Sequence, residues 1–369
     1  MAQQSDIEWT DGTWPIVQGC SYESPGCKNC YAVPLVWRLA HNPLAKIAKP
    51  LRGLVEERGG HRVWTGKVAL RRDRLDWPLK WKKPQMIFVP SHGDLFHEDV
   101  PDEFIDKVFA VMALTPRHTY QVLTKRAARM RQYFEERWQG TPARRYQVGK
   151  EVFQLPAGGE TGRFHQVEAA VIELAEDLGL ADPDNDALWN EKGEMLARQF
   201  AWPLPNVWLG VSVEDQRHAD ERIPHLLAAP AAKRFISAEP LLSGIDLTTL
   251  CPGHYFVDAM SGTKYHDSPE PSPTASTGKL DWVIAGGESG PGARPMHPDW
   301  VRDLRSQCAR AGVPFFFKQW GDWCPYIGRG APPHRFSEWQ ALDATWVAYR
   351  IGKKAAGAML DGVEHRAMP

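Results

Sequence analysis

The chain has 369 residues, 43% of them hydrophobic and 24% charged, which is typical of a soluble globular protein rather than a disordered or fibrous one. It carries 44 Lys and Arg against 45 Asp and Glu, so its net charge of −1 shows no overall basic excess of the kind that marks nucleic-acid-binding proteins. No stretch approaches the roughly 20 apolar residues that cross a bilayer. We therefore expect a cytoplasmic protein without a membrane partner, whose six cysteines are reduced thiols.

Short apolar runs recur along the chain, and most are followed by a segment with helical periodicity. Strands are expected at Trp14–Gly19, Lys67–Leu70, Met86–Pro90, Tyr120–Thr124, Val207–Val213, Arg234–Ala238, Trp282–Ala285 and Pro314–Lys318. Helices are expected at Asp102–Leu114, Arg126–Arg137, Asp215–Leu227 and Pro298–Ala311, the last with proline in its first turn and Gly312 past its end. About eight alternating units predict an α/β fold, a full or partial parallel barrel within residues 1–325.

Two segments interrupt this alternation and are interpreted as insertions, at about residues 138–205 and 243–279. The first contains an amphipathic stretch, Phe164–Leu178, that predicts a helix. The second contains HDSPEPSPTASTG, a composition typical of a mobile loop. Residues 326–369 show no clear periodicity and are expected to form a C-terminal extension.

Three cysteines lie close together in GCSYESPGCKNCYA, directly after the first predicted strand. Cys20, Cys27 and Cys30 are spaced C-x6-C-x2-C, and a loop at the carboxyl end of a barrel strand faces the barrel mouth, where active sites lie. Three thiolates on a four-iron cluster leave one iron open, whereas structural zinc has four protein ligands. A zinc site with His41 or His61 as fourth ligand, and inert thiols, remain alternatives. Three further cysteines have no neighbouring cysteine and are interpreted as non-ligands: Cys251, Cys308 and Cys324.

Polar side chains follow the ends of several predicted strands, and a barrel brings these ends to one face. They are Ser91, His92, Asp94 and His97 after the third strand, Thr124 and Lys125 after the fourth, Ser212 and Glu214 at the fifth, and Ser237 and Glu239 at the sixth. Glu239 is the strongest single candidate because a carboxylate at the end of an apolar strand needs a partner. Structural roles remain open for the others, such as a turn cap for Asp94 or a helix start for Glu214.

The stretch AGGESGPGARP follows the seventh predicted strand and is rich in glycine. Gly286 and Gly287 would let the backbone approach a ligand closely, with Glu288 and Arg294 as polar groups beside it. No Gly-Lys-Ser/Thr follows, and the spacing of a dinucleotide fingerprint is absent, so nucleotide hydrolysis is not expected. Lys318 and Gln319 end the last predicted strand.

The cysteine loop and its position after the first strand resemble the radical S-adenosylmethionine superfamily. The superfamily motif is C-x3-C-x2-C with an aromatic residue before the last cysteine, whereas this loop has a six-residue first gap and Asn29 before Cys30. The resemblance implies a 4Fe–4S cluster on the three cysteines, S-adenosylmethionine on its open iron, and an electron donor such as a flavodoxin or ferredoxin. In this interpretation the catalytic residues are Glu239, Asp94 and Lys125, and the cofactor-binding residues are Tyr31, Ser212, Glu214, Gly286, Gly287 and Glu288.

A closer resemblance rests on SHGDLFHEDVP, VLTKR, GVSVEDQ, SAEPLL, GGESGPGARPMHPDWVRDLRSQC and PFFFKQWG together with the cysteine motif. These segments are similar to an uncharacterised family of phages and bacteria, whose encoded neighbours are called three-Cys-motif partner proteins. The resemblance covers most of residues 5–325. It implies a three-Cys-motif partner protein and a role in phage biology or genome maintenance.

Basic residues alternate with tryptophans in Arg62–Lys83, and Lys125, Arg126, Arg129 and Arg131 form a second basic segment. Cations beside aromatic faces are typical of nucleic-acid grooves, although solvated helices with tryptophans in the core would give the same pattern. Two functions follow as hypotheses. The first is a radical enzyme acting on a nucleotide or nucleic acid, and the second is a non-catalytic zinc- or cluster-containing binding protein.

Overall fold

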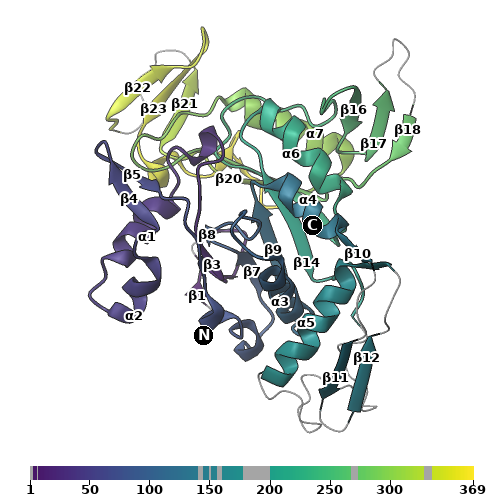
Figure 1. The fold of residues 1–369 in the computed structure, drawn as a ribbon. Helices are drawn as coiled ribbons and strands as arrows, with labels where there is room; N and C mark the ends of the chain where they lie inside the picture. Colours follow the sequence, from purple (N-terminus) through teal and green to yellow (C-terminus); the bar gives the residue numbers. More distant parts are fainter. Residues whose placement is uncertain are drawn as a thin grey trace.

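A computed structural model describes residues 3–5, 7–139, 144–148, 151–155, 160–177, 200–266, 273–327 and 335–369. Its main sheet has the strand order β1 (Gln3–Gln4), β2 (Gly12–Thr13), β7 (Met86–Val89), β9 (Thr119–Thr124), β14 (Val207–Ser212), β15 (Lys233–Ala238), β19 (Trp282–Gly286) and β20 (Phe315–Gln319). β1 is antiparallel to β2, and the other seven strands are mutually parallel. The sheet curls into a half-barrel (Figure 1), so a partial parallel barrel is confirmed.

The predicted helices form between the strands and cover the outer face of the sheet (Figure 1). They are α3 (Asp102–Ala113), α4 (Ala127–Glu135), α6 (Gln216–Ala228) and α7 (Pro298–Ala311). α7 begins as its sequence predicts, because Pro298 needs no backbone partner in the first turn and His297 caps the N–H of Asp299. It ends at Gly312, which adopts a left-handed conformation with φ 65°. Among the described residues, none of the helices combines the length and the apolar character that crossing a membrane requires.

The inner face of the half-barrel is filled by an aromatic cluster near the amino ends of the strands. This inner aromatic cluster consists of Trp9, Phe88, Trp208, Phe235, Trp282, Ile284 and Phe316. Its members alternate along the strands with residues that face the helices, such as Leu209 beside Trp208. The interior is therefore packed at one end, where Gln121 on β9 also donates to the Trp9 carbonyl at 3.1 Å.

Gly210 is required by the close packing of Phe235 against β14. A methyl group at Gly210 would lie 2.4 Å from the Phe235 ring, which is buried within the inner aromatic cluster and has no room to move aside. Gly210→Ala is expected to lower the free energy of unfolding by about 1–3 kcal/mol in urea titrations. Gly244→Ala is the matched control, because its added methyl would meet Trp300 at an ordinary contact distance of 3.5 Å. Equal destabilisation by both substitutions would contradict this packing.

The strand predicted at Trp14–Gly19 forms over its last three residues alone, and a separate short strand, β2 at Gly12–Thr13, precedes it. β2 joins the main sheet, and β3 (Val17–Gly19) leaves it to pair with β6 (Ala69–Leu70) and β8 (His92–Gly93). The strand predicted at Lys67–Leu70 forms at its last two residues, Ala69–Leu70, where it lies antiparallel to β3 and adds no unit to the barrel. This arrangement leads the chain from β3 onto the carboxyl-terminal edge of the sheet, where Cys20 follows.

Between Cys30 and β6 the chain forms a small unit that the sequence patterns do not predict. It contains α1 (Ala32–Ala40), α2 (Ala45–Ala48) and the hairpin of β4 (Val55–Arg58) and β5 (His61–Trp64). A short 3-10 helix at Lys49–Leu51 also belongs to this unit. The other 3-10 helices lie outside it, at Pro25–Cys27 before α1 and at Arg72–Arg74 and Pro78–Lys80 after β6. The unit has a hydrophobic core of its own, made of Val33, Val36, Leu51, Leu54 and Val55.

The first interrupting segment carries β10 (Arg137–Gln139) paired with β13 (Glu160–Gly162), β11 (Arg144–Val148) paired with β12 (Glu151–Leu155), and α5 (Arg163–Asp177). α5 confirms the helix predicted at Phe164–Leu178 over Phe164–Asp177, and Leu178 lies outside the described ranges. The second segment forms β16 (Tyr255–Asp258), β17 (Thr263–His266) and β18 (Pro273–Ser276). The predicted loop HDSPEPSPTASTG thus contributes β18, while its residues 267–272 lie outside the described ranges.

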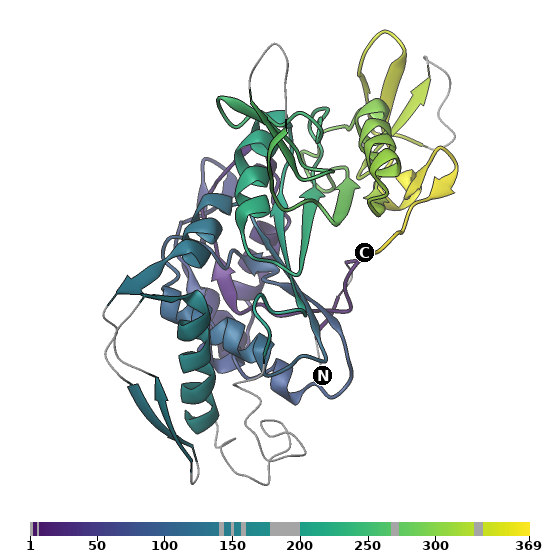
Figure 2. The ribbon, with the colours of Figure 1, turned by 90° about the vertical axis from the view of Figure 1, so that its right-hand side faces the viewer.

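The C-terminal extension contains β21 (Trp323–Ile327), β22 (Glu338–Ala341) and β23 (Trp346–Arg350), which form a separate antiparallel sheet. α8 (Lys353–Ala356), β24 (Met359–Leu360) and β25 (Val363–Glu364) follow. A bridge between Phe316 and Arg366 returns the end of the chain to β20. Figure 2 shows this yellow part of the chain at the end of the molecule opposite α5 and β11–β12.

Candidate metal and cofactor site

The cysteine loop, residues 20–31, runs from the end of β3 to the start of α1. Its middle is a 3-10 turn in which the Cys27 N–H donates to the Ser24 carbonyl at 2.8 Å, and the Cys30 N–H donates to Cys27 at 3.3 Å. All three cysteines are free and half-buried. Burial, reinforced by Asp94, raises the pKa of Cys20 to about 12, and burial also raises the pKa of Cys30.

Arg126, at the end of β9, fixes the first part of the cysteine loop. Its guanidinium donates to Ser21 Oγ at 2.7 Å and lies 3.6 Å from Cys20 Sγ. Asp94 orients it through a 3.0 Å ion pair and also accepts a hydrogen bond of 2.6 Å from Thr124 Oγ1. Asp94 is thereby a support for the loop as well as a strand-end carboxylate.

Glu214, after β14, lies under the middle of the loop. Its fully buried carboxylate pairs with Lys125 Nζ at 2.8 Å and Arg222 Nη1 at 3.1 Å, and its other oxygen accepts from the Gly26 N–H at 3.4 Å. Burial alone would raise the pKa of Glu214, but the two cations outweigh it and hold the pKa at about 2. A side chain at Gly26 would approach Lys125 and Glu214 within 3.1–3.2 Å, so the glycine lets the loop lie against this ion pair.

Glu288, after β19, fixes the last part of the loop together with Arg294. The two side chains form a bidentate pair of 2.8 and 2.9 Å, and Asn29 Nδ2 donates to the same carboxylate at 3.0 Å. Arg294 also donates to the Pro25 carbonyl at 3.0 Å. Burial alone would raise the pKa of Glu288, but hydrogen bonds from Arg294 and Asn29 lower it overall.

Tyr31 closes the loop on its other side, since its hydroxyl donates to the Ser91 carbonyl after β7 at 2.8 Å. Groups that follow four strands of the half-barrel, β7, β9, β14 and β19, therefore hold the cysteine loop over the carboxyl-terminal edge of the sheet. Five predicted site residues take part in these contacts: Tyr31, Asp94, Lys125, Glu214 and Glu288.

Glu239 belongs to a second polar group, beside the loop. It pairs with Lys318 Nζ at 3.1 Å and accepts from Ser237 Oγ at 3.0 Å. Its Oε1 occupies the space where a Gly286 side chain would lie, 2.7 Å from the added carbon. In the described part of the chain, Ser91 Oγ and Gln319 Oε1 at the same sheet edge are buried without a hydrogen-bond partner.

Gly287 and Ser212, also predicted as cofactor-binding residues, make contacts that stabilise the fold. A side chain on Gly287 would meet the Trp320 carbonyl at 1.9 Å, so this glycine is needed for the close approach of the chain after β20. Ser212 is in register with Ser237 on β15, and its carbonyl accepts from Arg222 at 2.8 Å.

The sequence patterns do not predict several of the residues that hold the loop, above all Arg126, Asn29 and Arg222. Arg126 belongs to a segment interpreted as a basic surface, yet the whole segment is paired. Arg126 binds Asp94, Arg129 binds Asp102 and Arg131 binds Glu135. The signal that could have found Arg126 is its place at a strand end.

The thiols fit a metal centre by their chemistry, because three soft donors share one loop at the sheet edge. In the described ranges, however, no three His, Cys, Asp or Glu side chains are grouped as ligands of a metal ion. His41 and His61, the alternative zinc ligands, lie at the far end of α1 and in the β4–β5 hairpin, and the His41 ring packs against Trp37. Neither joins the three cysteines.

Together the half-barrel and its loop define an α/β protein of partial-barrel class with a cysteine-rich loop at the sheet edge. The chain belongs to the family described as a protein of unknown function, DUF5131, whose model matches residues 4–369. Neither a curated protein nor a solved structure matches it.

Proposed function

We propose that the chain is an iron–sulfur enzyme of the radical S-adenosylmethionine type, with Cys20, Cys27 and Cys30 as the cluster ligands. The observation that carries the proposal is the fixing of the cysteine loop over the carboxyl-terminal edge of a parallel half-barrel. This edge is where enzymes of parallel barrel folds place their active sites. Cys20, Cys27 and Cys30 would hold a 4Fe–4S cluster, and such a cluster would supply the one-electron chemistry that S-adenosylmethionine needs as a radical source.

The residues at the sheet edge have two proposed tasks, and the first is to position the cysteine loop. Arg126, Glu214 and Glu288 position the loop through their contacts with Ser21, Gly26 and Asn29. These contacts hold the loop rigidly, and metal-ligand side chains need such support to keep a fixed geometry.

The second task is to bind the polar groups of the cofactor or substrate. Lys318 and Glu239 offer opposite charges, and Ser91 Oγ and Gln319 Oε1 are unpartnered among the described atoms. A buried polar atom without a partner is costly, so a polar ligand at this edge would satisfy it. The inner aromatic cluster closes the other end of the interior against water.

Metal analysis tests the proposal. The protein is purified anaerobically, reconstituted with iron and sulfide, and assayed for iron, sulfide and zinc. We expect about four irons per chain and a brown protein. A colourless protein that retains one tightly bound zinc after the same treatment would instead support the zinc-containing binding protein and end the iron–sulfur proposal.

A further inference from the structure

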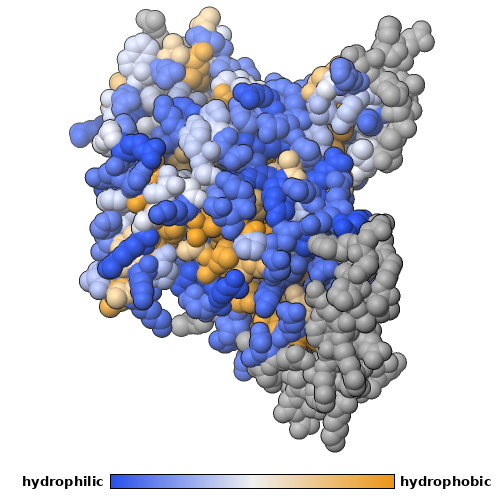
Figure 3. Space-filling model, viewed as in Figure 1, coloured by the Kyte–Doolittle hydropathy of each residue, from blue (hydrophilic) through white to orange (hydrophobic). Residues whose placement is uncertain are grey.

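Positive charge is concentrated in one part of this nearly neutral chain. Residues 31–83 hold 13 Lys and Arg against four Asp and Glu, whereas the rest of the chain holds 31 against 41. The α1–α2 unit and its hairpin carry much of this excess. Its exposed cations include Arg38, Lys46, Lys49, Arg52, Arg58, Arg62 and Lys67. Figure 3 shows strongly hydrophilic residues on the side of the molecule where Figure 1 places this unit.

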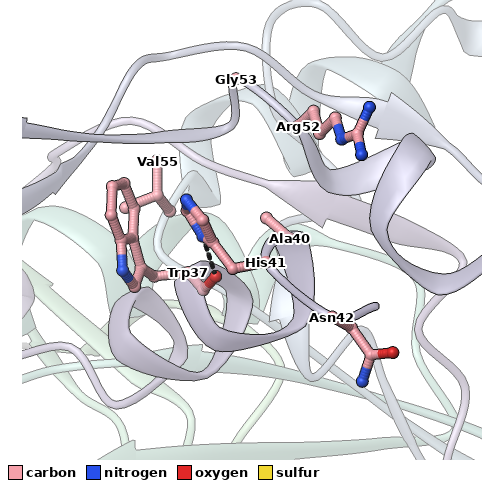
Figure 4. A pocket seen from close by; sticks show the side chains of 7 residues that line it. All are labelled: Trp37, Ala40, His41, Asn42, Arg52, Gly53 and Val55. Carbon is pink, nitrogen blue, oxygen red and sulfur yellow. Dashed lines mark hydrogen bonds between the residues drawn. The ribbon is translucent and has the colours of Figure 1, made fainter. Parts of the chain in front are cut away.

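A pocket of about 450 Å³ lies within this basic region, at the end of α1 remote from the cysteines. Its lining residues are Trp37, Ala40, His41, Asn42, Arg52, Gly53 and Val55. Figure 4 shows the Trp37 and His41 rings together on one wall, with Arg52 and Asn42 on the other side. The volume falls in the range of small-molecule sites, about 300–1,000 Å³.

The pocket wall offers an aromatic surface that is already fixed in place. The His41 and Trp37 ring centroids are 4.2 Å apart, and His41 Nδ1 lies 2.8 Å from the Trp37 carbonyl. The Arg62 guanidinium also lies 5.2 Å from the Trp37 ring centroid. The exposed His41 ring is thus held by contacts on its own helix, and little conformational entropy is lost when a flat ligand stacks on it.

Arg52 supplies an available cation at the pocket rim. Within the described ranges Arg52 makes no hydrogen bond or ion pair, whereas Arg58 and Arg62 are partly neutralised by Glu56 and Glu57. A flat aromatic wall with an uncompensated guanidinium beside it matches a base joined to a phosphate.

We propose that this Trp37 pocket binds one unpaired nucleotide of a single-stranded nucleic acid, whose neighbouring phosphates follow the exposed cations of α1, α2 and the hairpin. The base stacks on His41, and Arg52 pairs with its phosphate. Groove binding of single strands combines these same elements, aromatic platforms and a basic track. Duplex nucleic acid presents no free base face and cannot use the His41 wall.

Helix α1 connects the cysteine loop to the pocket. α1 starts next to Cys30 and has nine residues, a rise of about 14 Å. A strand anchored at the pocket would pass within a few nucleotides of the loop. The identification of this strand as the substrate rests on the proposed function, whereas the binding itself does not.

Fluorescence anisotropy with labelled oligothymidylate, oligouridylate and a DNA duplex tests the proposal. We expect the protein to bind at least one single strand more tightly than the duplex, and to lose affinity as salt rises. Arg52→Glu should weaken single-strand binding about tenfold and reduce the salt slope by about one. Arg310→Glu, an exposed cation on α7, is the matched control and should bind like the unaltered protein.

His41→Ala provides the second variant and should weaken single-strand binding at least about fivefold, because stacking on a base is lost. Equal affinities for Arg52→Glu and Arg310→Glu, or duplex binding as tight as single-strand binding, would overturn the proposal. Anisotropy measures strand binding and the iron assay measures the cluster, so the two proposals are tested by separate readouts. An iron-loaded protein without single-strand affinity would therefore reject this inference alone, and a strand-binding protein without iron would reject only the proposed function.

Discussion

Cys27→Ala is expected to lose almost all iron after anaerobic reconstitution. Cys27 is the central thiol of the loop, between Cys20 and Cys30 in the sequence. A cluster with three protein ligands has none to spare, so two thiolates should not retain it. Iron and sulfide assays, with the absorbance near the cluster's charge-transfer bands, measure the loss.

Cys251→Ala is the matched control for this substitution. Cys251 is an exposed free cysteine in a different part of the fold, where its thiol donates to the Gly253 carbonyl. This variant should keep the iron content of the unaltered protein. If Cys27→Ala also kept it, the ligands would have been assigned wrongly.

Glu214→Gln is expected to cost about 3–5 kcal/mol of folding free energy, the largest stability effect among these substitutions. The change removes the carboxylate charge that pairs with both Lys125 and Arg222, and the Arg222 side chain is 2% exposed. A buried cation that loses its partner is strongly destabilising. Urea unfolding at neutral pH measures the effect, and Glu221→Gln on the exposed face of α6 serves as the control with little expected change.

The stability that Glu214 contributes should also depend on pH. Its pKa is about 2 in the folded protein against an ordinary value of 4.5, because Lys125 and Arg222 outweigh burial; His218, 3.7 Å away, adds a further positive charge when protonated. A lowered pKa means that this contribution, about 3 kcal/mol, is complete above pH 4.5 and disappears as the pH falls toward 2. The stability difference between the unaltered protein and Glu214→Gln should therefore shrink over this range. A constant difference would contradict the assigned ion pair.

Much of the barrel is predictable from the sequence because its strands and helices follow local rules. The apolar runs at β9, β14, β15, β19 and β20 are short, rich in β-branched or aromatic residues, and buried on both faces. α7 is marked at both ends by Pro298 and Gly312. Such signals lie within a few residues of the element that they specify.

Pairing partners are less predictable, since they depend on residues distant in the sequence. The run at Lys67–Leu70 forms a strand at its last two residues, but nothing in its composition indicates that it pairs with β3 rather than with β7. Arg126 lies in a basic segment that has the composition of a solvated helix, and its partner Asp94 lies 32 residues earlier in the chain. The half-barrel therefore follows from local patterns, while the support of the cysteine loop emerges only in three dimensions.

Reductive cleavage of S-adenosylmethionine tests the proposed function most directly. The reconstituted protein is reduced anaerobically with dithionite in the presence of S-adenosylmethionine, and 5′-deoxyadenosine is measured by chromatography, with Cys27→Ala treated in parallel. We predict that the unaltered protein releases 5′-deoxyadenosine and that Cys27→Ala releases none. An unaltered protein that carries four irons and still forms no 5′-deoxyadenosine would contradict the assignment.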